Sequence, residues 1–278
     1  MKLFVTGATG FIGLHFIYAA HKAGHEVVGL RRVGSQPRID LKKQPIWVEG
    51  LLDSDFSKTL RDCDAFVHFA SHTPNPPYDT LENCLYWNLI TTLQLCNQAL
   101  KAGIKKFLIA GSCFEYGKSG ERYDYIPTTA PLEPTMTYPT SKAAASIALY
   151  GWAVEKQVQL QILRIFQVFG EGELETRLWP SLKKAALNAE DFPMTKGEQI
   201  RDFIHVEEVV IKFVEELKFI SVNKGEPRIL NIGTGKPQSI LEFSKYWWHK
   251  WNAKGRLQIG AVPYRENEVM RYVPEILP

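Results

Sequence analysis

The chain has 278 residues, with 33 Lys or Arg against 30 Asp or Glu, so its formal net charge is +3. A composition of 45% hydrophobic and 23% charged residues is that of a globular protein, which excludes a disordered chain. The charge is nearly neutral without a basic run, and no apolar run approaches the ~20 residues of a membrane span, so we expect no nucleic-acid or membrane partner.

The first half of the chain alternates apolar, strand-like runs with helix-like segments. We predict strands at residues 2–5, 26–30, 46–48, 65–70 and 106–110, and helices at residues 11–23 and 80–102. Buried strands that alternate with helices are typical of a parallel sheet covered on both faces. The predicted fold class is therefore α/β, with a doubly wound parallel sheet of the Rossmann type.

The pattern changes at about residue 170. A largely irregular stretch that contains prolines runs to about residue 194, and an isolated helix is predicted at residues 206–217. We expect a dinucleotide-binding domain at residues 1–168, to which residues 201–232 return. Residues 169–200 and 233–278 are expected to form a smaller C-terminal domain that binds the substrate.

The four cysteines give no sign of a metal site. They are scattered, no pair has the C-x-x-C spacing, and no histidine is placed to complete a ligand set. The first predicted strand begins at residue 2, which leaves no room for a signal peptide. We therefore expect a cytoplasmic, metal-independent enzyme or binding protein.

A glycine-rich loop joins the first predicted strand to the first predicted helix, with a glycine at every third position. Such spacing lets the backbone turn tightly and approach a pyrophosphate at the N-terminus of the following helix. Glycines of this kind also occur in ordinary turns, but the position directly after an N-terminal strand favours dinucleotide binding. The candidate cofactor-binding residues in this loop are Gly7, Thr9, Gly10, Phe11, Ile12 and Gly13.

Arg31 and Arg32 follow the second predicted strand. A site for NAD would carry Asp or Glu at about this point, to hold the ribose 2′-hydroxyl. Two cations suit a 2′-phosphate instead, because arginine binds phosphate in a bidentate way. The pair therefore favours NADP(H) as the cofactor. NAD(H) stays possible, since the two arginines can equally be solvated surface residues.

Three further residues have the side chains that carbonyl chemistry needs. Tyr138 and Lys142 are four residues apart, so in a helix they share one face. A nearby ammonium lowers the pKa of a phenol, which makes it usable as a general acid or base. Ser112 follows the predicted strand at residues 106–110, at the sheet edge where a doubly wound fold binds ligands. The Y-x-x-x-K spacing alone is frequent, and a core tyrosine with a solvated lysine is the alternative.

The chain resembles the extended short-chain dehydrogenases/reductases of the NAD-dependent epimerase/dehydratase (sugar-nucleotide) family. The resemblance rests on motifs in the family's order, at residues 7–13, 86–88, 112–117, 138–142, 164–170, 201–206 and 231–235. It implies a Rossmann core, a smaller domain that holds a nucleoside-diphosphate sugar, and a homodimer that packs through two long helices per subunit.

The same resemblance implies roles for individual residues. By position, Ser112, Tyr138 and Lys142 form the catalytic triad, and Lys142 also holds the nicotinamide ribose. Ala70 and Asn88 join Tyr138 and Lys142 among the residues expected to bind the cofactor.

Arginines are the implied substrate ligands, together with Ser112. Arg201 and Arg265 fall where the family binds the diphosphate, and two arginines suit two phosphates. Arg265 rests on a weaker match and is otherwise an exposed charge. Arg177 opens a stretch similar to reductases that make O-antigen deoxysugars for surface polysaccharide, such as the CDP-abequose and CDP-paratose synthases.

One departure from the family pattern narrows the expected reaction. The 4,6-dehydratases of the family place Asp-Glu directly after the hydroxyl residue, whereas this chain has Cys113 and Phe114, which cannot act as that acid/base pair. The first hypothesis is therefore an NADPH-dependent reductase of the C4 keto group of a nucleotide-activated 6-deoxy-4-ketohexose. The alternatives are an NAD-dependent C4 epimerase and a non-enzymatic NADP sensor; such sensors typically lack an intact Tyr/Lys pair.

Overall fold

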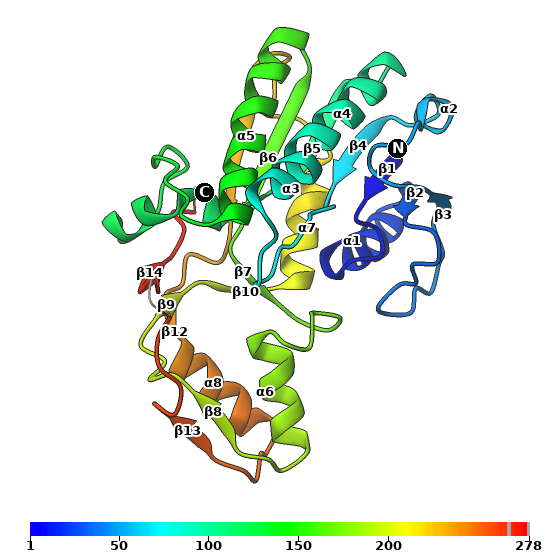
Figure 1. Cartoon of the computed structure of the whole chain (residues 1–278). Coiled ribbons are helices and arrows are strands. Elements are labelled where there is room, and N and C mark those ends of the chain that lie inside the picture. Colours follow the sequence, from blue (N-terminus) through cyan, green and yellow to red (C-terminus); the bar gives the residue numbers. More distant parts are fainter. Residues whose placement is uncertain (266–267, 277–278) are drawn as a thin grey trace.

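The computed structural model describes residues 1–265 and 268–276 (Figure 1). Its central strands are β1 (Lys2–Thr6), β2 (Glu26–Arg31), β3 (Ile46–Glu49), β4 (Ala65–His68), β5 (Lys106–Ser112), β6 (Gln159–Ile165) and β11 (Arg228–Ile232). All pairs between them are parallel, in the order β11-β6-β5-β4-β1-β2-β3. The order changes direction at β1, so the crevice of a doubly wound sheet lies beyond the carboxyl ends of β1 and β4. The predicted doubly wound parallel sheet is confirmed.

Helices cover both faces of this sheet, as its apolar strands require. The helices are α1 (Phe11–Lys22), α2 (Ser57–Leu60), α3 (Leu81–Leu85), α4 (Thr91–Lys101), α5 (Thr137–Lys156), α6 (Leu178–Leu187), α7 (Val206–Glu216) and α8 (Ile240–Lys250). Alternate residues of β1 point to opposite faces: Leu3 and Val5 pack with α1 and α7, whereas Phe4 packs with α4 and α5.

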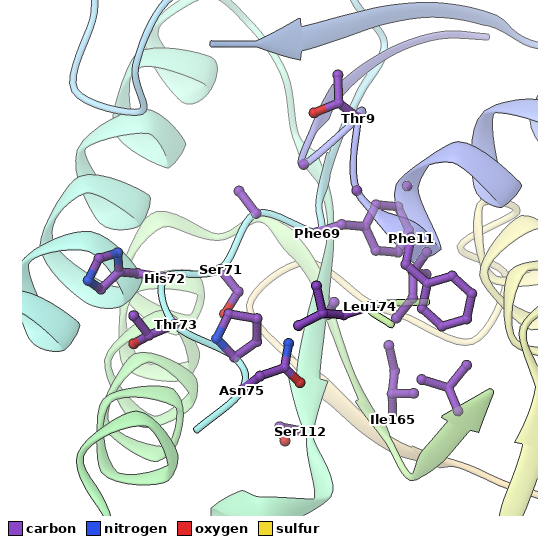
Figure 2. Close-up of a pocket in the computed structure, with 18 of the residues that line it drawn as sticks. Thr9, Phe11, Phe69, Ser71, His72, Thr73, Asn75, Ser112, Ile165 and Leu174 are labelled. Carbon is purple, nitrogen blue, oxygen red and sulfur yellow. The ribbon is translucent and has the colours of Figure 1, made fainter. Parts of the chain in front are cut away.

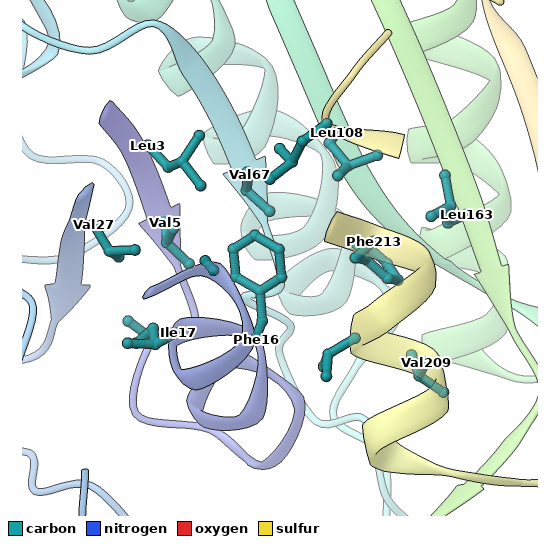
Figure 3. Packing of buried hydrophobic residues seen from close by; sticks show 14 of the residues in the cluster. Leu3, Val5, Phe16, Ile17, Val27, Val67, Leu108, Leu163, Val209 and Phe213 are labelled. Carbon is teal, nitrogen blue, oxygen red and sulfur yellow. The ribbon is translucent and has the colours of Figure 1, made fainter. Parts of the chain in front are cut away.

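The face that carries α1 and α7 holds a continuous apolar core (Figure 3). Phe16 of α1 and Phe213 of α7 are fully buried there, with ring centroids 6.4 Å apart. Burying one such side chain contributes about 1.5–3 kcal/mol. This packing holds the N-terminus of α1 at the carboxyl edge of the sheet, where the glycine loop lies.

The helix predicted at residues 80–102 is divided in the structure. A π-helical turn, η1 (Tyr86–Ile90), lies between α3 and α4. The wider turn holds Asn88 in the interior, where its side chain accepts a hydrogen bond from the backbone N–H of His72 (2.7 Å) and donates one to Ser141 Oγ (2.9 Å). Turns of this kind are frequent at functional sites.

The stretch read as irregular up to residue 194 contains helix α6, which corrects that expectation. Pro180 lies in the first turn of α6, where a proline breaks no intrahelical hydrogen bond, so it does not prevent the helix. Trp179 on α6 packs against Trp247 on α8, with ring centroids 5.5 Å apart. These two helices and β8 form the lower part of the molecule in Figure 1.

Short strands accompany these helices outside the central sheet. They are β7 (Gln167–Phe169), β8 (Phe192–Met194), β9 (Ile200–Arg201), β10 (Phe203–His205), β12 (Gln238–Ser239), β13 (Leu257–Ile259) and β14 (Arg271–Tyr272). They pair as β10-β7, β12-β9-β14 and β13-β8. Within residues 1–265 and 268–276, no helix has the length and apolar character required to cross a membrane.

Candidate active site

A cavity of about 880 Å³ opens at the carboxyl ends of the central strands. Figure 2 shows Thr9 and Phe11 on one side of it, with Leu174 between these residues and Ser71 and Ser112. All six cofactor candidates of the glycine loop line this cavity, as do Ala70, Ser112 and the Tyr138/Lys142 pair. The structure therefore brings the glycine loop and the predicted catalytic groups to one site.

Two glycines of the loop are required by close backbone approach. Gly7 has φ +66°, and a Cβ there would lie 2.6 Å from the backbone nitrogen of Ala70. A Cβ on Gly13 would lie 2.2 Å from the carbonyl oxygen of Gly7. Any side chain at either position would therefore displace the loop from α1 or from β4.

The N-terminus of α1 offers unpaired N–H groups to the cavity. Its N-cap is Gly10, which supplies no side-chain cap, and the first turn contains no acidic residue. The positive end of the helix dipole then favours an anion. A glycine cradle against a helix N-terminus fits the diphosphate of a dinucleotide, so the residues present fit the expected cofactor.

Three arginines lie at the end of the cavity beyond β2. Arg31 donates to Glu49 through Nε (3.2 Å) and Nη2 (3.0 Å), and its guanidinium lies 5.2 Å from the centre of the Trp47 ring. Arg32 and Arg38 also line the cavity, are exposed, and have no ion-pair partner within the described part of the chain. Arg31 is thus held by a carboxylate, and the two freer cations here are Arg32 and Arg38.

Ser112 is the last residue of β5, as the sequence predicted. Its side chain is 8% exposed, and its Oγ accepts a hydrogen bond from the backbone N–H of Phe114 (3.3 Å). Because this bond uses a lone pair of the hydroxyl oxygen, the hydroxyl proton stays available for a carbonyl oxygen in the cavity.

Tyr138 and Lys142 both lie in α5, one turn apart, as their spacing predicted. Each is 6% exposed, and Lys142 Nζ donates a hydrogen bond to the carbonyl oxygen of Ala110 in β5 (2.8 Å). The Tyr138 ring lies against that of Tyr78, with centroids 5.5 Å apart. The helix and β5 therefore bring a phenol, an ammonium and the Ser112 hydroxyl together.

Burial dominates the protonation of these groups. It raises the pKa of Tyr138 to about 12, although the hydroxyl groups of Ser71 and Ser112 lower that pKa in part. Burial also lowers the pKa of Lys142, and the negative charge of Glu115 opposes this shift. In this structure Tyr138 is thus a protonated phenol at neutral pH, ready to donate.

The three arginines predicted to bind substrate differ in their relation to the cavity. Arg177 lines the cavity, where its Nε donates to Glu173 (3.3 Å). Arg201 lies outside the cavity wall and donates to Glu268 (3.0 Å) and to the carbonyl oxygen of Val269 (2.7 Å). Arg265 is exposed and also lies outside that wall.

Arg177 and Arg265 share one neighbour, which sequence analysis missed. Burial raises the pKa of Tyr78, and the positive charges of both arginines oppose that shift, so both lie near its phenol. Tyr78 belongs to the segment between β4 and α3, and no sequence pattern distinguished it.

Asn88 does not face the cavity. It is 3% exposed, and its amide also donates to the carbonyl oxygen of His72 (3.3 Å), so it holds the chain segment after β4 against α5. These bonds make Asn88 a support for the segment next to the cavity, and its role in binding the cofactor stays a prediction.

Three further residues around the cavity escaped sequence analysis. Ser71 follows Ala70 at the carboxyl end of β4, and its buried Oγ has no hydrogen-bond partner among the described residues. Glu115 stands three residues after Ser112, the spacing of a capping box, which could have identified it. Glu173 lines the cavity, and burial raises its pKa to about 7.

Comparison with known proteins gives a consistent result. A model of the NAD dependent epimerase/dehydratase family matches residues 3–233. The CDP-abequose synthase of Salmonella muenchen is 27% identical over 276 residues, covering 97% of this chain and 87% of that protein. The UDP-glucose 4-epimerase of Corynebacterium glutamicum is 25% identical over 271 residues, covering 87% of this chain and 78% of that protein. The structure of MoeE5 in complex with UDP-glucose and NAD has a TM-score of 0.84 and 25% identity, covering 99% of this chain and 90% of that one.

Proposed function

We propose that this chain, which belongs to the NAD dependent epimerase/dehydratase family, reduces the C4 keto group of a nucleotide-activated 6-deoxy-4-ketohexose. The observation that carries the proposal is the arrangement around Ser112. Tyr138 and Lys142 share its cavity, whereas Cys113 and Phe114 occupy the positions that follow it. The site thus lacks the Asp-Glu pair of the family's 4,6-dehydratases, and its three polar groups suit hydride transfer at a C4 carbonyl, the chemistry of a reductase and of each half of a C4 epimerisation.

The geometry of the three groups supports a separate role for each. Ser112 donates its free hydroxyl proton in a hydrogen bond to the C4 carbonyl oxygen. Tyr138 transfers its proton to that oxygen as negative charge develops. Lys142, buried one turn away, holds the cofactor ribose and stabilises the phenolate that remains. When bound, the reduced nicotinamide cofactor supplies the hydride that C4 receives.

The protonated phenol of Tyr138, whose pKa burial raises to about 12, suits the proton donation of a reductase. A C4 epimerase uses the same three groups, so the cofactor end of the cavity is what favours the reductase: the exposed cations Arg32 and Arg38 suit the 2′-phosphate of NADP(H). The second candidate is nevertheless a C4 epimerase, because the UDP-glucose 4-epimerase of C. glutamicum is nearly as similar to this chain as the CDP-abequose synthase is.

We assign the cofactor as NADP(H), with NAD(H) as the alternative. Arg32 and Arg38 are exposed cations at the cavity end beyond β2, so they suit the 2′-phosphate. Arg31 contributes less than its position in the sequence suggested, because Glu49 already holds its guanidinium.

The substrate is expected between the two parts of the chain. We place the sugar nucleotide at the predicted domain of residues 169–200 and 233–278, of which 266–267 and 277–278 lie outside the described residues, with Arg177, Arg201 and Arg265 on its diphosphate side. Arg201 must exchange its bond with Glu268 to reach a phosphate. We regard these assignments as part of the same proposal.

We further propose a cytoplasmic homodimer. All four cysteines are free thiols, which suits a reducing compartment. Apolar side chains are exposed on adjoining faces of η1 and α5: Ile90 is 43% exposed and Ile147 64%. Pairing of these faces between two copies would bury them.

The proposed reaction is tested with the purified protein, NADPH or NADH, and enzymatically made dTDP- and CDP-4-keto-6-deoxyglucose. Loss of absorbance by the reduced nicotinamide, stoichiometric with the sugar and faster with NADPH, is the expected result. Absence of cofactor oxidation with both NADPH and NADH, together with release of NAD from the denatured protein, would contradict the reductase and support the C4 epimerase.

A further inference from the structure

A buried carboxylate lies directly behind the proposed catalytic serine. Glu115 is 0% exposed and lies in the short 3₁₀ turn η2 (Cys113–Tyr116). Its Oε1 accepts a hydrogen bond from the backbone N–H of Ser112 (2.8 Å). Its Oε2 accepts from Ser146 Oγ (2.8 Å) and from Arg164 Nε (2.9 Å). Burying a carboxylate costs free energy unless it is paired and hydrogen-bonded, so these three bonds stabilise Glu115 in the interior.

The three donors come from three different elements. Ser112 ends β5, Ser146 lies one turn beyond Lys142 on α5, and Arg164 belongs to β6. Glu115 therefore links the backbone of the serine to the helix that carries the other two catalytic groups. Arg164 continues the network away from the cavity, where it donates to Tyr116 (3.0 Å).

We propose that Glu115 is a positioning residue for the reaction: its carboxylate, bound to the backbone of Ser112, to Ser146 of α5 and to Arg164 of β6, fixes Ser112 relative to the helix that carries Tyr138 and Lys142. This inference rests on the proposed function only for the identity of the reacting groups. The same carboxylate also places a buried negative charge beside Tyr138 and Lys142, whichever sugar the site binds.

The charges around Glu115 explain why a carboxylate is needed rather than an amide. Arg164 faces it from β6, Lys142 and Tyr138 face it from α5, and Tyr116 is its neighbour in η2. Burial is the largest influence on both groups, raising the pKa of Tyr138 and lowering that of Lys142, and the charge of Glu115 acts to raise both. Replacing it by an amide would remove the anion that supports both protonated forms and would leave the guanidinium of Arg164 unpaired.

The test compares the dependence of kcat on pH in wild type, Glu115→Gln and Glu133→Gln. Glu133→Gln is the matched control, because it breaks an exposed ion pair with Arg122 and not a buried one. We expect Glu115→Gln to lower kcat by about tenfold to a hundredfold with little change in KM. We also expect its alkaline limb to move to lower pH by about one unit, because the proton donor then ionises more readily.

A second variant keeps the inference testable where Glu115→Gln does not fold. Glu115→Gln/Arg164→Met buries no unpaired charge and should fold. The alkaline limb of its kcat profile should lie at the same lower pH as in Glu115→Gln, because the charge that acts on Tyr138 is that of Glu115. An alkaline limb that stays at the wild-type pH in a folded variant would overturn the inference and leave Glu115 a purely structural residue.

A substrate-free measurement separates this inference from the proposed function. Spectra of protein labelled with ¹³C at the tyrosine phenol carbon, with the signal assigned by Tyr138→Phe, report ionisation of Tyr138 directly. Ionisation at lower pH in Glu115→Gln than in wild type supports the inference whatever the enzyme turns over. Ionisation at the same pH in both proteins contradicts it, even when the reductase assay succeeds.

Discussion

Replacement of Tyr138 by phenylalanine removes one buried hydroxyl and leaves the ring in place. The lost group is the proposed proton donor, and loss of a general acid costs about 10²- to 10⁴-fold in rate, or about 3–5 kcal/mol of barrier. The fold should change little. Tyr138 makes no hydrogen bond of ordinary geometry within the described residues, although Ser71 and Ser112 lie close enough to lower its pKa. We therefore expect kcat to fall by that factor. KM should change by less than about fivefold, and the free energy of unfolding should stay within about 1 kcal/mol of the wild-type value.

The assay is oxidation of NADPH by the 4-keto sugar nucleotide under saturating substrate. Tyr150→Phe is the matched control, since it is the same substitution in the same helix at a side chain that is 44% exposed. Its rate should equal that of wild type. A Tyr138→Phe protein that is folded, binds cofactor and retains more than about a tenth of the wild-type rate would refute the assignment of the acid.

Three more substitutions test the cofactor site and the cavity wall. Gly13→Ala should lower cofactor affinity by more than about tenfold, because its Cβ would lie 2.2 Å from the Gly7 oxygen. Equilibrium titration measures this affinity. The control is Gly151→Ala, whose Cβ meets nothing within 4 Å and which should bind the cofactor as wild type does. Arg32→Ala should raise the Kd for NADPH by roughly tenfold to a hundredfold and leave that for NADH unchanged; equal losses would remove its role at the 2′-phosphate. Burial raises the pKa of Glu173 from 4.5 to about 7, so the folded protein binds this proton more tightly than the unfolded chain does. The free energy of unfolding should therefore fall by about 3 kcal/mol as pH rises across that range. Urea unfolding of Glu173→Gln should lack this loss; identical pH profiles for variant and wild type would contradict the burial argument.

The shared position of the three proposed catalytic groups in one cavity could be predicted from sequence because local rules fix where each of them lies. Ser112 had to stand at the carboxyl end of a parallel strand, and Tyr138 and Lys142 had to share a helical face. The glycine loop follows equally local rules, since Gly7 and Gly13 have no room for a side chain. Each of these predictions needed only one element and its neighbour in the chain.

Partners that lie far apart in the chain could not be predicted in this way. Arg201 is bound by Glu268, 67 residues away, and Arg31 by Glu49 on the neighbouring strand. Both arginines were predicted to bind phosphate because the sequence does not reveal that a carboxylate of the same chain pairs with each of them. Tyr78 was missed because it lies in an irregular segment, where no periodicity indicates which side chains face the site.

The most direct test of the proposed reaction follows the hydride itself. The protein is supplied with NADPH that carries deuterium at the transferable position, and with a 4-keto-6-deoxy sugar nucleotide; the product is analysed by NMR and mass spectrometry. We predict one deuterium at C4 of the sugar for each NADPH oxidised, and no label in the product of the Tyr138→Phe enzyme beyond its residual rate. No deuterium in the sugar and no oxidation of cofactor, together with interconversion of the C4 epimers of a UDP-hexose supplied in a separate reaction, would contradict the reductase and identify the epimerase.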